Sequence, residues 1–217
     1  MRCVGLETCT RALSVALAED EEILLDVRDR DEHPRAHGIW KKFLEACRDA
    51  GYGLEEIDCV AVGTGPGRFT GIRAGVALGM GLRIALDCPM RGASSLDVLA
   101  YSVGDRASSG ETVVAYLPRP GSDSYYARSY IWGKDGPIPQ NDIEWLKEEA
   151  LELLGRRSTW TVGPDASRKT DSGAVTAWPR AAELVRWVTS DVSRPWQVFP
   201  LNYMMAPKVH PSDKGDS

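Results

Sequence analysis

The chain has 217 residues, of which 43% are hydrophobic, so it is long enough to bury a sizeable core as one large or two small domains. Its net charge of −5 excludes a protein that holds nucleic acid unaided, because phosphate binding needs a concentrated basic surface. Five cysteines without a C-x-x-C pair are typical of reduced, buried thiols in a cytoplasmic protein. No uncharged run reaches the roughly 18 to 20 residues of a membrane span, so we expect no membrane role.

The first half of the chain reads as strands followed by helices. Three short strands are predicted at 3–8, 13–18 and 23–27. Apolar residues at helical spacing then predict a helix over 36–50, which Gly51 ends. A buried strand is predicted over 57–62, a helix from 70 to about 86, and a further helix that Ser94 or Ser95 caps and that continues to 102.

The second half also predicts strands and helices, but from weaker sequence patterns. Strands at 112–117 and 125–132 are expected to form a hairpin through the proline- and glycine-containing turn between them. Asn141 or Asp142 is expected to cap a helix to 154, followed by a strand at 159–162 and a helix from Pro179 to about 190. Gly, Ser and charged residues over 104–110 place a domain boundary there, giving domains 1–104 and 105–217 with a disordered tail after about 207.

The most informative segment is the glycine-rich block over 62–81. Its loop contains Gly65 and Gly67, and the following helix carries glycine every fourth residue, so these glycines share one face. Each costs about 1 kcal/mol relative to alanine, so something must pack close to that face. This is either the protein's own core or a partner helix, and we favour the partner. The predicted contact residues are Arg68, Gly71, Ile72, Gly75, Val76 and Gly79.

Three stretches carry a family resemblance: residues 6–10 with 13–17, the block 65–75, and Ser94-Ser95-Leu96. Over residues 1–104 the chain strongly resembles the TsaB (YeaZ) family, subunits of the bacterial machinery that makes threonylcarbamoyladenosine next to the anticodon of certain tRNAs. The resemblance implies an α/β fold with two lobes of the actin-like ATPase and sugar-kinase (ASKHA) type, in which helices flank mixed sheets. It implies association of the first lobe with a TsaD-type catalytic subunit.

The same resemblance implies further partners, and the chain departs from the family pattern at several positions. A TsaE-type ATPase is expected in the complex, with ATP or ADP bound there and no cofactor held by this chain alone. The sequence leaves open whether the chain is a homodimer without its partner, and we expect it to bind tRNA only through the complex. The chain departs from the family pattern at Glu7, where Asp is usual, at Arg68, where Ser is usual, at Leu117-Pro118, where Asp-Ala is usual, and at Met205, where Arg often stands.

Catalysis by the chain itself has little support in the sequence. A metal-assisted transferase needs several converging ligands, whereas the chain has only His33, His37 and His210. The segment 91–96, which corresponds to the paired histidines of catalytic relatives, contains none. We therefore predict no catalytic residue and no metal site. The alternative is an autonomous ATP-dependent transferase or a metallopeptidase-like enzyme.

A weaker candidate is a phosphate or nucleotide cleft between the lobes. Hydroxyls and backbone N–H groups near the glycine loop could face a phosphate, although no Walker-type loop occurs. The candidate residues are Glu7, Thr8, Thr10, Gly65, Gly67 and Thr70.

Overall fold

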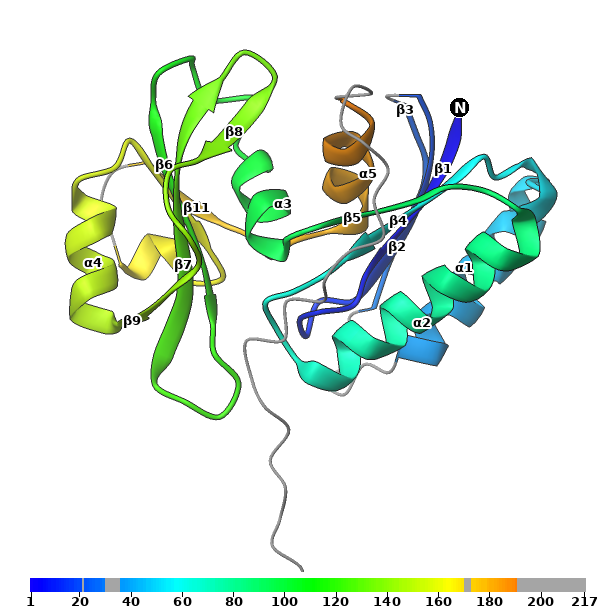
Figure 1. The fold of residues 1–217 in the computed structure, drawn as a ribbon, viewed down its shortest axis with the longest axis horizontal. Helices are drawn as coiled ribbons and strands as arrows, with labels where there is room; N and C mark the ends of the chain where they lie inside the picture. Colours follow the sequence, from blue (N-terminus) through cyan, green and yellow to red (C-terminus); the bar gives the residue numbers. More distant parts are fainter. Residues whose placement is uncertain (21, 30–35, 170–172, 191–217) are drawn as a thin grey trace, which may run out of the picture.

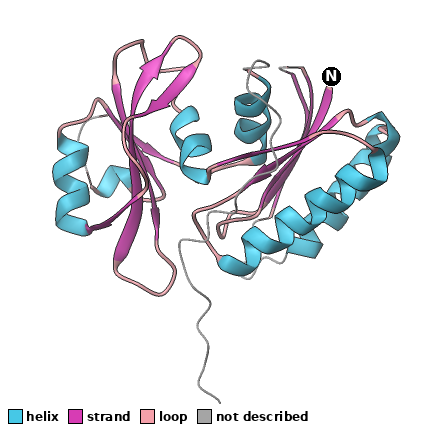
Figure 2. Ribbon diagram, in the orientation of Figure 1, coloured by secondary structure: helices cyan, strands magenta, loops and turns pink. Residues whose placement is uncertain are grey.

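The computed structural model describes residues 1–20, 22–29, 36–169 and 173–190. Two β-sheets lie side by side, and each is flanked by helices (Figures 1 and 2). The predicted disordered tail after 207, Met205, His33 and His210 lie outside the described residues, and the side chain of His37 is not described.

The first sheet has five strands in the order β3-β2-β1-β4-β5. The pairs β1–β2 and β2–β3 are antiparallel, whereas β1–β4 and β4–β5 are parallel. Both of its faces are buried, as helices on two sides require. The strands are β1 (Arg2–Glu7), β2 (Ser14–Glu19), β3 (Glu22–Arg28), β4 (Cys59–Gly63) and β5 (Met90–Ala93).

The second sheet repeats this topology. Its six strands follow the order β11-β10-β6-β7-β8, with β9 also paired to β7. An antiparallel hairpin is again followed by parallel pairing, of β6 with β10 and of β10 with β11. The strands are β6 (Thr112–Pro118), β7 (Ser124–Gly133), β8 (Gly136–Pro139), β9 (Glu144–Lys147), β10 (Trp160–Gly163) and β11 (Ala174–Thr176).

Helices cover both sheets. α1 and α2 pack on one face of the first sheet and α5 on the other, while α3 lies between the two sheets and α4 covers the outer face of the second (Figure 1). In α1, Ile39, Phe43 and Cys47 recur at helical spacing and are buried. The helices are α1 (Ala36–Ala50), α2 (Phe69–Leu86), α3 (Ser95–Tyr101), α4 (Glu148–Arg156) and α5 (Ala181–Thr189), with 3₁₀ turns at Leu54–Glu56 and Ala166–Arg168.

Most predicted elements are confirmed, and the exceptions depend on tertiary pairing. The predicted helix from 141 is wrong over its first half, because Asn141 accepts the Ser129 N–H and the following residues form β9 against β7. The strands β5, β8 and β11 were not predicted. The domain division at 104 needs a correction for α5, which follows the boundary in sequence but packs against the first sheet. At the start of α5, the Ala181 N–H donates a hydrogen bond to the Ser14 hydroxyl of β2.

Among the described residues, α2 is the one helix long and apolar enough to cross a membrane by length and composition. It contains Arg73 and Arg83, and its Gly75, Gly79 and Leu82 are buried against the first sheet. We therefore interpret α2 as a helix of the first lobe. All five cysteines are buried and free, as the sequence predicted.

Candidate functional site

The polar cluster at the carboxyl end of β1 is centred on Glu7. This side chain is fully buried, and its carboxylate accepts hydrogen bonds from the Cys9 N–H at 2.9 Å and the Ser95 hydroxyl at 3.1 Å. It lies over Gly63, where a Cβ would stand 2.3 Å from Oε2. Burial raises the pKa of Glu7 to about 7, although the hydrogen bonds from Cys9 and Ser95 oppose that shift. Glu7 therefore joins β1 to the start of α3.

The glycine loop after β4 is held on both sides by backbone hydrogen bonds. The Thr64 N–H donates to the Ala93 carbonyl, and the Gly65 carbonyl accepts the Ser95 N–H at 2.7 Å. On the other side, the Arg68 N–H donates to the Cys9 carbonyl at 2.6 Å. The Gly65–Pro66 peptide bond is cis. The loop thus connects the turn after β1 with the start of α3.

The glycine face of α2 packs against the protein's own first lobe. A Cβ on Gly71 would stand 2.1 Å from the Thr8 carbonyl oxygen, one on Gly75 2.2 Å from the Thr8 hydroxyl, and one on Gly79 2.6 Å from Val62. The Thr8 hydroxyl also donates to the Gly71 carbonyl at 2.7 Å. The predicted partner contact through this face is therefore wrong, because Thr8, just after β1, and Val62 of β4 already occupy the space that the glycines leave.

The remaining members of that predicted contact divide between the two sides of α2. Ile72 is 2% exposed and Val76 packs partly against the core of the first lobe, so neither is available to a partner. Arg68 is exposed. The opposite side, which we call the outer α2 face, carries the exposed residues Thr70, Arg73, Ala77, Gly81, Ile84 and Ala85. Ile84 alone is 74% exposed.

The residues of the predicted phosphate cleft lie partly together. Glu7, Thr8, Gly65 and Gly67 meet where β1, the glycine loop and α2 converge, whereas Thr70 is exposed on α2. The Thr10 hydroxyl accepts the Ala12 N–H at 3.2 Å. These residues do not fit a phosphate group, because the Glu7 carboxylate already occupies the Cys9 and Ser95 donors that such an anion would use.

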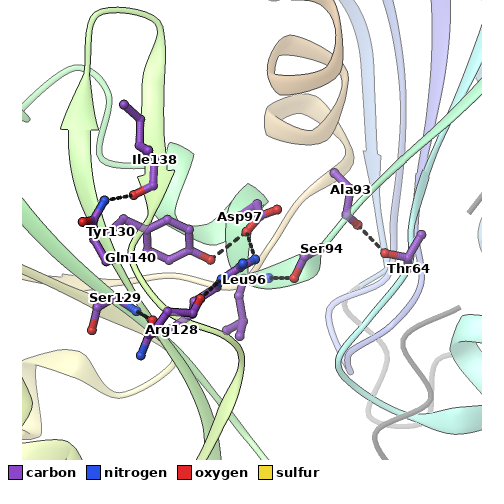
Figure 3. A network of polar contacts seen from close by, with 11 residues as sticks. Thr64, Ala93, Ser94, Leu96, Asp97, Arg128, Ser129, Tyr130, Ile138 and Gln140 are labelled. Carbon is purple, nitrogen blue, oxygen red and sulfur yellow. Dashed lines mark hydrogen bonds and ion pairs between the residues drawn. The ribbon is translucent and has the colours of Figure 1, made fainter. Parts of the chain in front are cut away.

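A second polar network fixes α3 to the second lobe. Asp97 on α3 accepts hydrogen bonds from the Tyr130 hydroxyl at 2.8 Å and from Arg128 Nη1 at 3.3 Å, both on β7 (Figure 3). Arg128 Nε also donates to the Asn141 carbonyl. Because Ser95 on the same helix bonds to Glu7 and Gly65, α3 links the polar groups of the two lobes.

The sequence did not identify Asp97, Arg128, Tyr130 or the role of Ser95. These residues meet only through the register of β7 and the position of α3, and neither is visible as a local pattern. In the part of the chain that the structure describes, no group of His, Cys, Asp and Glu side chains is placed to hold a metal ion.

Duplicated sheets of one topology, each with helices on its faces, define a two-lobed α/β protein of the actin-like class.

The family model described as "TsaD: tRNA N6-adenosine threonylcarbamoyltransferase" matches residues 37–117. The TsaB protein of Escherichia coli is 28% identical over 183 residues, covering 78% of this chain and 77% of that protein. The TsaB protein of Haemophilus influenzae is 30% identical over 125 residues, covering 58% and 52% respectively.

The solved structure of YeaZ from Pseudomonas aeruginosa has the same fold. It superposes with a TM-score of 0.72 at 24% identity, covering 86% of this chain and 90% of that one. The chain is thus similar in sequence to TsaB proteins and has the fold of YeaZ.

Proposed function

We propose that this chain is the non-catalytic partner of a TsaD-type catalytic subunit in tRNA threonylcarbamoyladenosine biosynthesis. The similarity to TsaB proteins and the match of residues 37–117 to a TsaD-type model support a role in this pathway and a partner of related fold. The observation that carries the proposal is the outer α2 face. Exposed Ile84, together with Ala77, Gly81 and Ala85, presents apolar surface that a partner helix can cover.

The polar centre of the first lobe supports a structural rather than a catalytic role. Glu7, Cys9 and Ser95 are each fully buried, and Glu7 binds the other two within the chain. Ser94, in the segment where the resemblance implies histidines in catalytic relatives, accepts the Leu96 N–H as the cap of α3. These groups fix the packing of α3 instead of facing a substrate.

We propose that the other subunits of the complex supply the nucleotide site and the catalytic residues. We place the assembly in the cytoplasm, with ATP or ADP held by the complex and a TsaE-type ATPase joining it. In isolation, the outer α2 face would pair with that of a second copy, which gives a symmetric homodimer. An autonomous transferase or peptidase is the alternative, and steady ATP turnover by the purified chain alone would favour it.

The test is a charge placed on the outer α2 face. Ile84→Glu is expected to weaken co-purification with the TsaD-type subunit at least about tenfold, because burying an unpaired carboxylate in an apolar contact costs several kcal/mol. Leu153→Glu is the matched control, since Leu153 is 54% exposed on α4 of the second lobe and should tolerate the same change.

Association and tRNA modification are measured together with the reconstituted complex. Both should fall for Ile84→Glu and stay at the wild-type level for Leu153→Glu, with both variants folded by circular dichroism. An intact complex with Ile84→Glu would show that the outer α2 face is not the contact.

The isolated chain is expected to hold tRNA only weakly. Its net charge is negative, and non-specific binding depends on clustered cations that release counterions. A filter-binding titration at physiological salt should therefore give a dissociation constant no tighter than about 10⁻⁶ M. Sub-micromolar binding without a partner would contradict the proposal that tRNA is held through the complex.

A further inference from the structure

Two hydrogen-bond donors in the second lobe are buried together without an acceptor. They are Nε of Arg119, just after β6, and the hydroxyl of Tyr126 on β7, a residue with no exposed surface. Buried donors are normally satisfied, so a pair that is not satisfied needs an explanation such as a missing ligand. Such an explanation must account for both groups at once.

The two donors are neighbours. Burial raises the pKa of the Tyr126 hydroxyl, and the guanidinium of Arg119 beside it opposes that shift. The register of β6 and β7 pairs Tyr126 with Leu117, two residues before Arg119. Neither Nε of Arg119 nor the Tyr126 hydroxyl has a partner that meets hydrogen-bond geometry in the structure. Both donors are thus available to a shared acceptor.

Trp145 covers this pair from β9. The register places it opposite Tyr126, and its ring centroid lies 4.3 Å from Cζ of Arg119. Stacking occupies a face of the planar guanidinium and leaves its N–H edge for a ligand. Because 53% of Trp145 is exposed, this side chain can move aside to admit one.

Arg128 lies on the same face of the second sheet as Tyr126 and, unlike Nε of Arg119, its Nε has a hydrogen-bond acceptor among the described residues. It binds Asp97 and the Asn141 carbonyl, whereas Arg119 has no carboxylate partner in the part of the chain that the structure describes. Leu117 and Tyr126 belong to the core cluster that packs on α3, so Arg119 and Tyr126 lie toward the side of the second sheet that faces α3.

We propose that Arg119 and Tyr126 form a binding site for an oxyanion, either a carboxylate or a phosphate, with Trp145 as its cover. A charged guanidinium and a neighbouring phenolic hydroxyl, both without an acceptor, supply the charge-assisted and neutral hydrogen bonds that such a group accepts. The site is separate from the Glu7 cluster, whose donors are already occupied.

The experiment is a titration of the full chain, followed through the Arg119 Nε–H signal by NMR. Sodium phosphate and sodium acetate are the two probes, and sodium chloride keeps the ionic strength constant. Each probe that binds should shift this signal saturably and raise the thermal unfolding midpoint in step with its occupancy. Arg119→Lys and Tyr126→Phe should each raise the dissociation constant about tenfold, because each removes a hydrogen bond to a charged group.

Arg106→Lys is the matched control, since Arg106 is exposed and lies outside the site. It should leave both titrations unchanged. Binding of phosphate alone, of acetate alone or of both supports the site and identifies its ligand class. No saturable shift with either probe, or binding that Tyr126→Phe leaves unchanged, would overturn the proposal. Tyr126→Phe removes only one hydroxyl with no hydrogen-bond partner, so it keeps the test valid even if Arg119→Lys fails to fold.

Discussion

Gly71→Ala is expected to lower the free energy of unfolding of the isolated chain by about 2 kcal/mol, the scale of overpacking in a close contact. The added Cβ would stand 2.1 Å from the Thr8 carbonyl oxygen, a backbone atom that can yield only if α2 moves away from the end of β1. That movement would also strain the hydrogen bond from the Thr8 hydroxyl to the Gly71 carbonyl. The measurement is urea unfolding followed by circular dichroism.

Gly81→Ala on the same helix is the matched control and should have the opposite sign. A Cβ at Gly81 meets nothing within 4 Å, so alanine should stabilise the chain by about 1 kcal/mol through its higher helix propensity. Equal effects of the two substitutions would show that the glycine face of α2 does not pack closely on β1. Unchanged stability with Gly71→Ala and lost association would instead restore the partner contact that the sequence favoured.

The sequence could not decide which side of α2 faces inward. Both sides carry apolar residues, since Ile72 and Leu82 lie on one and Ala77 and Ile84 on the other. Hydrophobic periodicity identifies an inward face only when the opposite face is polar. The glycine spacing correctly indicated a close contact, but the identity of the neighbour depends on the position of the first sheet. That position is a property of the tertiary fold.

Elements with a strong local pattern were predicted well. The bounds of α1 agree with the prediction, and the hairpin of β6 and β7 lies where its turn residues placed it. The missed strands β8 and β11 are short edge strands, and β8 contains Pro137 and Pro139, which weaken a strand pattern. Their pairing is decided by the neighbouring strand, so single-sequence patterns carry little information about them.

The candidate sites were predicted only in part for the same reason. Glu7 and the glycine loop were identified because each lies in a distinctive local motif. Trp145 is distant in sequence from Arg119 and Tyr126, and only the register of β9 against β7 brings it to them. The sequence therefore shows where unusual backbone occurs, whereas hydrogen-bond partners across elements require the fold.

Glu7→Gln is expected to remove a pH dependence of stability from the wild-type chain. The pKa of Glu7 is about 7 in the folded chain, chiefly because of burial, and 4.5 for an ordinary glutamate. Between these two values the folded state binds more protons than the unfolded state, so wild-type stability falls as the pH rises. This stabilisation of about 3 kcal/mol is fully present below pH 4.5 and is lost as the pH rises through about 7.

The measurement is the free energy of unfolding of wild type and Glu7→Gln from pH 4 to pH 8. Glutamine keeps an oxygen that accepts from Cys9 or Ser95 but cannot ionise, so the stability of the variant relative to wild type should increase with pH by about 3 kcal/mol. Burial raises the pKa of the neighbouring Cys9 thiol, which stays protonated over this range. Glu149→Gln, at an exposed glutamate of α4, should show no comparable trend. A stability difference between Glu7→Gln and wild type that stays constant with pH would mean that Glu7 is charged throughout, and that Cys9 and Ser95 compensate fully for its burial.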